Sequence, residues 1–246
     1  MLRLEIRSKR FGAVEALRGF ALTAAWGEVV ALVGPSGCGK TTALSIIAGL
    51  DRDFDGTLSV APDPDGRPPR IGPPRIGMVF QEPRLLPWRT VRQNLALALP
   101  RALRRDPRID ATLALLDLSA LADRFPGHLS LGMARRAALA RALVVDPDLL
   151  LLDEPLVSLD EVTAQRLRAL LARVLDGRPR TALLVTHNLR EALALADRLL
   201  ILAPSPGRVV AEIPIATPRA ARDDAMVEAL RADLLARADP VFRLLA

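Results

Sequence analysis

Short apolar runs, each followed by a polar or glycine-rich segment, dominate the hydrophobic pattern of this chain of 246 residues. Several of these runs are almost wholly apolar, as in strands that are buried on both faces of a parallel sheet. They are EVVALV at 28–33, DLLLL at 148–152, ALLVT at 182–186 and RLLIL at 198–202. Helical spacing of apolar positions at about 161–176 and 188–196 predicts helices between them. The alternation indicates an α/β fold, with a mostly parallel sheet and helices on both faces.

A different pattern lies between the first and the later strands. Residues 90–145 are rich in Ala, Leu and Arg and predict one helix after another, so we expect a helical subdomain at about 84–146 inserted into the α/β core. Before it, PPRIG occurs twice in tandem, at 68–72 and 73–77. The prolines predict an exposed loop that ends where the strand IGMVF begins. Residues 1–232 would form the main domain, and 233–246 a short C-terminal helical tail.

The sequence predicts a chain that stays in the cytoplasm. The longest apolar runs are far shorter than a membrane span, and the segment MLRLEIRSKRFG lacks the apolar core of a signal peptide. Cys38 is the single cysteine, which excludes an internal disulfide and fits a reducing compartment.

The net charge of +6 raises the hypothesis of a nucleic-acid partner. The arginines are interspersed with acidic residues, however, and aromatic residues make up 3% of the chain, so a solvated surface is the favoured interpretation and no nucleic acid is expected. Of the 34 basic residues, only Lys9 and Lys40 are lysines. Where such a chain retains lysine, the chemistry calls for a compact ammonium rather than a planar guanidinium.

The segment GPSGCGKTT fits the P-loop pattern G-x-x-x-x-G-K-T, between a predicted strand and a predicted helix. Its glycines let backbone N–H groups point at phosphate oxygens, and the helix adds its positive N-terminal end. Lys40 would reach the β and γ phosphates, and the Thr41 hydroxyl would bind Mg²⁺. The candidate nucleotide-binding residues are Gly34, Pro35, Ser36, Gly37, Cys38, Gly39, Lys40, Thr41 and Thr42.

Two carboxylates and one histidine follow later strands. Asp153 ends the strand in LLLLDE and is a candidate Mg²⁺ ligand through water, and Glu154 is the candidate general base for the attacking water. A helix-capping role is the alternative for either carboxylate alone. His187 ends the strand in LLVTHN, where a contact with the γ-phosphate is favoured over a purely structural role. His128 lacks such a context and is expected to be structural.

Together these residues resemble the ATPase subunit of ABC transporters, and the resemblance covers nearly the whole chain. Phe11 lies where that family carries an aromatic residue that stacks on adenine, and Gln81 matches the Q-loop, which touches Mg²⁺ or water. LSLGM at 129–133 lies where the family has LSGGQ, SLD at 158–160 matches the D-loop, and His187 the H-loop. The resemblance implies a P-loop NTPase-type, mostly parallel sheet with an antiparallel β edge and an inserted helical subdomain.

The resemblance also implies a mechanism. Two subunits, here two identical ones, meet head to tail and hold each ATP between one P-loop and the other subunit's signature, where Ser130 and the Gly132 N–H would meet the γ-phosphate. Closure on Mg-ATP would move an integral membrane permease at the cytoplasmic face of the membrane, and a solute-binding protein outside would deliver the substrate. Hydrolysis would use Glu154, with Lys40, Gln81 and His187 at the phosphates.

Two further segments are similar to the importers for nitrate, aliphatic sulfonates and taurine: FQEPRLLPWRTVRQNLALAL, with LLPW after the Q-loop, and LLVTHNLREALALADRLLILAPSPGRV, with PGR. The implied substrate is a small, mostly anionic solute. Two alternatives stay open at this point: a soluble ABC-type ATPase that acts on nucleic acid, and a degenerate subunit that binds ATP without hydrolysing it. The second depends on Leu131 and Met133, which depart from the signature. We expect Leu131 to be tolerated, because a helix that starts after Ser130 requires no positive φ there.

Overall fold

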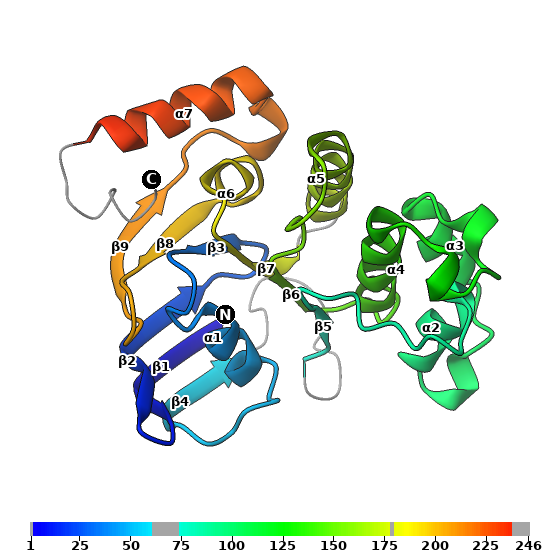
Figure 1. The fold of residues 1–246 in the computed structure, drawn as a ribbon, viewed down its shortest axis with the longest axis horizontal. Helices are drawn as coiled ribbons and strands as arrows, with labels where there is room; N and C mark the ends of the chain where they lie inside the picture. The colour runs from blue at the N-terminus through cyan, green and yellow to red at the C-terminus, as the bar shows by residue number, and fades with distance from the viewer. Residues whose placement is uncertain (1, 61–73, 178–179, 238–246) are drawn as a thin grey trace. The chain divides into compact units, whose positions relative to one another are not determined.

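The computed structural model describes residues 2–60, 74–177 and 180–237. The chain divides into two compact units, Met1–Pro74 with Val174–Ala246, and Arg75–Arg173 (Figure 1). The first PPRIG repeat and the last nine residues of the predicted tail lie outside the described residues.

An antiparallel sheet opens the first unit. It consists of β1 (Leu2–Phe11), β2 (Val14–Ala24) and β4 (Asp55–Val60) in the order β2-β1-β4. Buried and exposed residues alternate along most of β1, as expected for a strand with one covered face. This sheet supplies the antiparallel edge that the family resemblance implies.

The parallel strands of the first unit are β7 (Thr181–Thr186), β3 (Val29–Val33) and β8 (Arg198–Leu202), in that order. β9 (Val209–Pro214) joins β8 in antiparallel orientation. All residues of β3 and β7 are buried, which explains why both segments read as continuous apolar runs. The predicted mostly parallel α/β fold is confirmed.

Helices α1 (Lys40–Ile47), α6 (Leu189–Leu195) and α7 (Asp224–Ala236) belong to the same unit. Asp223 caps α7 by accepting a hydrogen bond from the Met226 N–H, so the helix begins well before the predicted tail at 233. Helix α5 (Glu161–Asp176) matches its predicted range and crosses the boundary between the two units.

The second unit combines a parallel pair of strands with helices. Strands β5 (Ile76–Val79) and β6 (Leu149–Asp153) flank α2 (Val91–Leu97), α3 (Arg108–Leu115) and α4 (Leu131–Leu143) along the chain. Gly77 allows β5 to approach α4, because a Cβ there would lie 2.4 Å from the Ala142 carbonyl oxygen. The unit is wider than the predicted subdomain at about 84–146, since it also contains β5, β6 and the start of α5.

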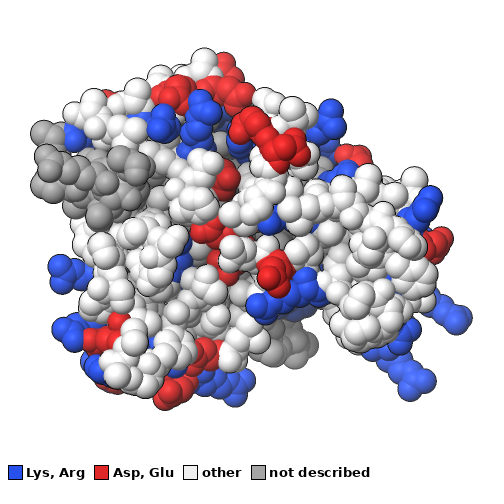
Figure 2. Space-filling model, in the orientation of Figure 1, with Lys and Arg blue, Asp and Glu red and all other residues white. Residues whose placement is uncertain are grey.

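Charged side chains of both signs are interspersed over the face shown in Figure 2. This distribution fits the expectation of a solvated surface rather than a stripe that follows a nucleic-acid backbone. Among the described residues, no helix has the length and apolar character that crossing a bilayer requires.

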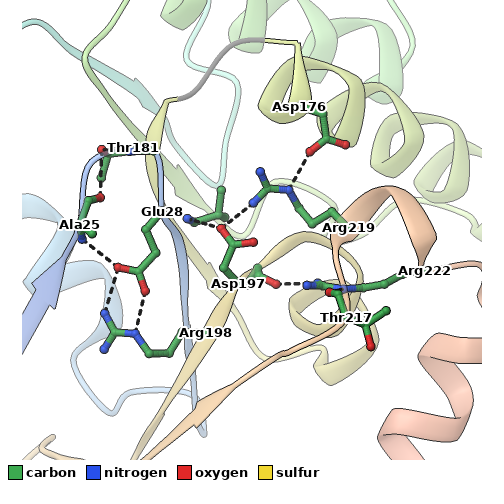
Figure 3. Close-up of polar contacts among 12 residues, drawn as sticks. Ala25, Glu28, Asp176, Thr181, Asp197, Arg198, Thr217, Arg219 and Arg222 are labelled. Carbon is green, nitrogen blue, oxygen red and sulfur yellow. Dashed lines mark hydrogen bonds and ion pairs between the residues drawn. The ribbon is translucent and has the colours of Figure 1, made fainter. Parts of the chain in front are cut away.

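Two arginines in the segment after β9 bind this segment to the rest of the first unit (Figure 3). The Arg219 side chain is 12% exposed and donates to the carboxylates of Asp176, at 2.9 Å, and Asp197, at 2.7 Å. Arg222 donates to the carbonyl oxygens of Leu193, at 2.8 Å, and Ala196, at 2.5 Å, at the end of α6. Burial lowers the pKa of the Arg222 guanidinium. Arg222 thus satisfies helix carbonyls that have no partner within the helix.

Replacing Arg222 by Met should lower the free energy of unfolding by about 1–3 kcal/mol, because two helix carbonyls lose a charged donor. Urea unfolding followed by circular dichroism measures the change. Arg3→Met is the control, since the Arg3 side chain is 63% exposed and pairs with Glu5 at the surface, an interaction worth about 0–1 kcal/mol. An equal decrease in the free energy of unfolding in Arg222→Met and Arg3→Met would contradict the capping role of Arg222.

Candidate functional site

The predicted P-loop connects β3 to α1. Gly37 and Gly39 adopt positive φ angles of 78° and 92°, which glycine accepts without the steric cost that a side chain imposes. Gly39 is the N-cap of α1, so no side chain caps this helix. A loop with left-handed glycines that ends on an uncapped helix N-terminus suits an anion, and these residues therefore fit a triphosphate.

Lys40 is the first residue of α1 and is 6% exposed. Its Nζ donates to the carbonyl oxygens of Gly34, at 2.8 Å, and Pro35, at 2.9 Å, so the ammonium lies inside the loop. The Sγ atom of Cys38 lies 3.9 Å from the Lys40 Nζ, and burial raises the pKa of the Cys38 thiol. Cys38 is therefore a small, buried member of the loop, as expected from the sequence.

The loop is supported by two close backbone approaches. A Cβ on Gly34 would lie 2.9 Å from the Leu202 carbonyl oxygen, and a Cβ on Gly207 would lie 1.9 Å from the Cys38 carbonyl oxygen. Gly207 belongs to the segment PGR, whose only significance in the sequence is a family resemblance. The structure gives it a physical role, because only glycine lets this turn reach the P-loop.

His187 follows β7 directly, and its side chain is exposed. The parallel register pairs Val33 with Thr186, so His187 leaves the sheet at the same end as the P-loop. Asn188 caps α6 by accepting hydrogen bonds from the N–H groups of Arg190, at 2.9 Å, and Glu191, at 3.4 Å. Strand end and helix cap together fix the backbone on both sides of His187.

Phe11 is the last residue of β1 and is 54% exposed. An exposed aromatic ring on a strand end can offer a face to a planar base. Phe11, the P-loop and His187 thus all belong to the first unit.

Within the second unit, Gln81 and Asp153 lie at one end of the β5–β6 pair. The register pairs Val79 with Leu152, Gln81 follows β5 and is exposed, and Asp153 ends β6 with 3% exposure. Arg141 of α4 donates to the carbonyl oxygens of Pro83, at 3.0 Å, and Arg84, at 2.6 Å. The backbone after Gln81 is therefore fastened to α4.

Glu154 adopts a left-handed backbone, with φ 48°, which costs a residue with a side chain about 1–2 kcal/mol. The buried Arg135 of α4 compensates by donating from Nη1 to the carbonyl oxygens of Glu154, at 3.1 Å, and Pro155, at 2.9 Å. Strain held in place by a dedicated contact is typical of functional positions. Sequence reasoning missed Arg135 and Arg141, because in LGMARRAALARAL they look like solvated helix residues.

The variant signature forms the N-terminus of α4. Ser130 is the N-cap, and its Oγ accepts from the Met133 N–H at 3.3 Å. Leu131 is the first helical residue, does not have a positive φ and is 43% exposed, as expected. A Cβ on Gly132 would lie 2.5 Å from Cγ2 of Thr163, whose N–H donates to Asp160 of the predicted D-loop at 2.9 Å. Gly132 therefore permits contact between α4 and the start of α5.

Among the described residues, no three His, Cys, Asp or Glu side chains cluster as a self-contained metal site. Proteins commonly hold Mg²⁺ through one or two carboxylates together with substrate phosphates and water. Of the residues predicted to bind Mg²⁺, Thr41 lies in the first unit, and Gln81 and Asp153 lie in the second.

Gly132→Ala should destabilise the chain by about 1–3 kcal/mol, because the new methyl group collides with Thr163. In a Thr163→Ser background, which lacks Cγ2, most of the loss should disappear. Gly127→Ala is the control, since nothing lies within 4 Å of a Cβ there. Chemical unfolding of the four variants measures these effects, and the absence of any rescue by Thr163→Ser would contradict the contact.

Comparison with known proteins identifies the family. Residues 17–157 match the model of the family described as ABC transporter. The aliphatic sulfonates import ATP-binding protein SsuB 2 of Burkholderia cenocepacia is 46% identical over 237 residues, covering 96% of this chain and 86% of that protein. The aliphatic sulfonates import ATP-binding protein SsuB 1 of Pseudomonas aeruginosa is 48% identical, covering 88% of each chain.

Solved structures agree with these sequence matches. A dimeric structure of the ATP-binding cassette MJ0796, in a post-hydrolysis state bound to ADP and Pi, superposes with a TM-score of 0.72 at 28% identity. The match covers 89% of this chain and 100% of that one. This chain therefore belongs to the ABC transporter family, as one of its ATP-binding subunits that hydrolyse ATP.

Proposed function

We propose that this subunit drives the import of a small organic sulfonate. The observation that carries the proposal is the 46% identity, over 96% of the chain, to an aliphatic sulfonates import ATP-binding protein. The segments after Gln81 and around His187, which resemble the importers for nitrate, sulfonates and taurine, support the same substrate class.

The proposed partners follow from this function. Two copies of the chain would pair head to tail, so that the α4 N-terminus of one copy meets the nucleotide held by the P-loop of the other. An integral membrane permease would hold the pair at the cytoplasmic face of the membrane, and a solute-binding protein outside would deliver the sulfonate. The dimeric state of the structurally similar cassette supports the pairing.

Each predicted site residue has a proposed task. The P-loop N–H groups and Lys40 bind the phosphates, Phe11 stacks on adenine, and Thr41, Gln81 and Asp153 would hold Mg²⁺, which supplies positive charge beside the transferring phosphate. Ser130 and Gly132 present the helix N-terminus to the partner's γ-phosphate. Glu154 accepts the proton of the attacking water, and His187 donates to the phosphate.

The local geometry at the signature argues against a degenerate subunit. Leu131 lies in ordinary helical backbone and is exposed, so the change from glycine leaves Ser130 and Gly132 in helix-cap geometry. A nucleic-acid role gains no support from the interspersed charges of Figure 2.

The substrate is tested with the ATPase, its permease and its binding protein reconstituted in proteoliposomes. We expect an alkanesulfonate to stimulate ATP hydrolysis and to accumulate inside the vesicles, whereas nitrate should do neither. Calorimetric titration of the binding protein with an alkanesulfonate, taurine and nitrate measures a Kd for each ligand and so ranks their affinities independently. Stimulation by nitrate alone would overturn the proposed substrate class.

Glu154→Gln should lower the ATP turnover number by at least about 100-fold, because the general base is lost, while Mg-ATP binding persists. The variant should also accumulate as an ATP-bound dimer, measurable by gel filtration with Mg-ATP. Glu161→Gln is the control, because Glu161 is an exposed carboxylate in the first turn of α5 and should keep normal turnover. Near-normal hydrolysis by Glu154→Gln would refute the assignment of the base.

A further inference from the structure

Lys9 is a buried lysine in a chain that otherwise relies on arginine. Only Lys9 and Lys40 are lysines among 34 basic residues, and the Lys9 side chain is 2% exposed. A lysine is almost never fully buried unless its charge is paired. Lys40 has its task in the P-loop, so the second lysine requires an explanation of its own.

The Lys9 ammonium connects β1 to the end of the P-loop helix. Its Nζ lies 2.9 Å from the Asp51 carboxylate and donates to the Asp53 carbonyl oxygen at 2.5 Å. Asp51 follows α1 closely, and its N–H donates to the Ser45 carbonyl oxygen at 3.2 Å as the helix ends. The strand that ends in Phe11 and the helix that begins with Lys40 are thus joined through one ammonium.

The same ammonium lies against the ring of Phe11. The distance from Nζ to the ring centroid is 4.5 Å, within the range in which a cation is attracted to an aromatic face. The register of β1 shifts between Lys9 and Arg10, so it is the measured contact, and not the regular alternation of a strand, that places the two side chains together. Nζ thus lies over one face of the ring, while the Phe11 residue as a whole is 54% exposed.

A lysine suits this position better than an arginine. Three rotatable N–H donors on a compact centre can serve a carboxylate, a carbonyl oxygen and a ring at once, whereas the guanidinium donors are confined to one plane.

We propose that Lys9 is a positioning residue for the nucleotide base: it fixes the Phe11 ring so that adenine stacks on the open face. This inference rests on the proposed role of Phe11 in stacking on adenine. A ring that is ordered before binding spares the cost of ordering it when the nucleotide arrives, which strengthens binding.

The test is a double-mutant cycle on the full chain, with Kd measured for Mg-ATP and for Mg-tripolyphosphate, which occupies a P-loop but has no base. Lys9→Met should raise the Kd for ATP about fivefold, equivalent to about 1 kcal/mol at 1.4 kcal/mol per tenfold. The Kd for tripolyphosphate should stay unchanged. In a Phe11→Ala background, Lys9→Met should change the Kd for ATP by less than about twofold.

A second substitution of Lys9 and a control substitution on the same strand complete the test. Lys9→Gln keeps a hydrogen-bond donor for Asp51 or the Asp53 carbonyl but carries no charge to attract the ring. It should therefore weaken ATP binding as much as Lys9→Met does, and it keeps the inference testable should Lys9→Met fold poorly. Arg7→Met removes an exposed arginine of the same strand, paired with Asp55, and should leave both constants unchanged.

The possible failures are distinguishable. Equal weakening of ATP and tripolyphosphate, or a full effect of Lys9→Met without the Phe11 ring, would overturn the positioning role. If Phe11→Ala weakens ATP binding and both Lys9 variants do not, Phe11 keeps its proposed role and only the inference on Lys9 fails. If Phe11→Ala leaves the Kd for ATP unchanged, the stacking role of Phe11 is itself wrong.

Discussion

Hydrogen bonds from arginine side chains to backbone carbonyls hold the loops on which the candidate site depends. In the second unit, Arg135 binds the carbonyls of Glu154 and Pro155, and Arg141 binds those that follow Gln81. In the first unit, Arg222 closes the helix that follows His187. Because a guanidinium carries five donors in a rigid plane, one arginine can bind two consecutive carbonyls, and a loop held in this way has little freedom to change its backbone.

Two of these arginines, Arg135 and Arg141, belong to the same helix, α4. Because Ser130 caps α4, one helix carries the signature at its N-terminus and holds two loops of the candidate site along its length. A displacement of α4 would therefore reach those loops through the guanidinium groups that bind their backbone carbonyls. The glycine at 132 keeps the start of α5 against the same helix end.

The sequence predicted those parts whose physics is local. Strand 198–202 and helix 161–176 have the predicted ranges, because buried runs and helical spacing are visible within one segment. The P-loop and the Ser130 cap were likewise predictable from spacing. Arg135 and Thr163 were not, because their importance depends on which carbonyl or glycine they meet after folding. The start of α7 at Asp224 was missed for a related reason: its cap, Asp223, is one of many aspartates in polar segments.

The left-handed backbone of Glu154 has an evolutionary consequence. Glycine and asparagine tolerate that conformation better than glutamate does, so replacing the glutamate by either relieves strain while removing the carboxylate. Under the proposed role of Glu154 as the general base, such a replacement should abolish hydrolysis and at the same time raise the stability of the fold. An inactive copy that arises after gene duplication would therefore remain well folded, so that, under the proposed pairing, a dimer of one active and one inactive subunit is an easily reached evolutionary outcome.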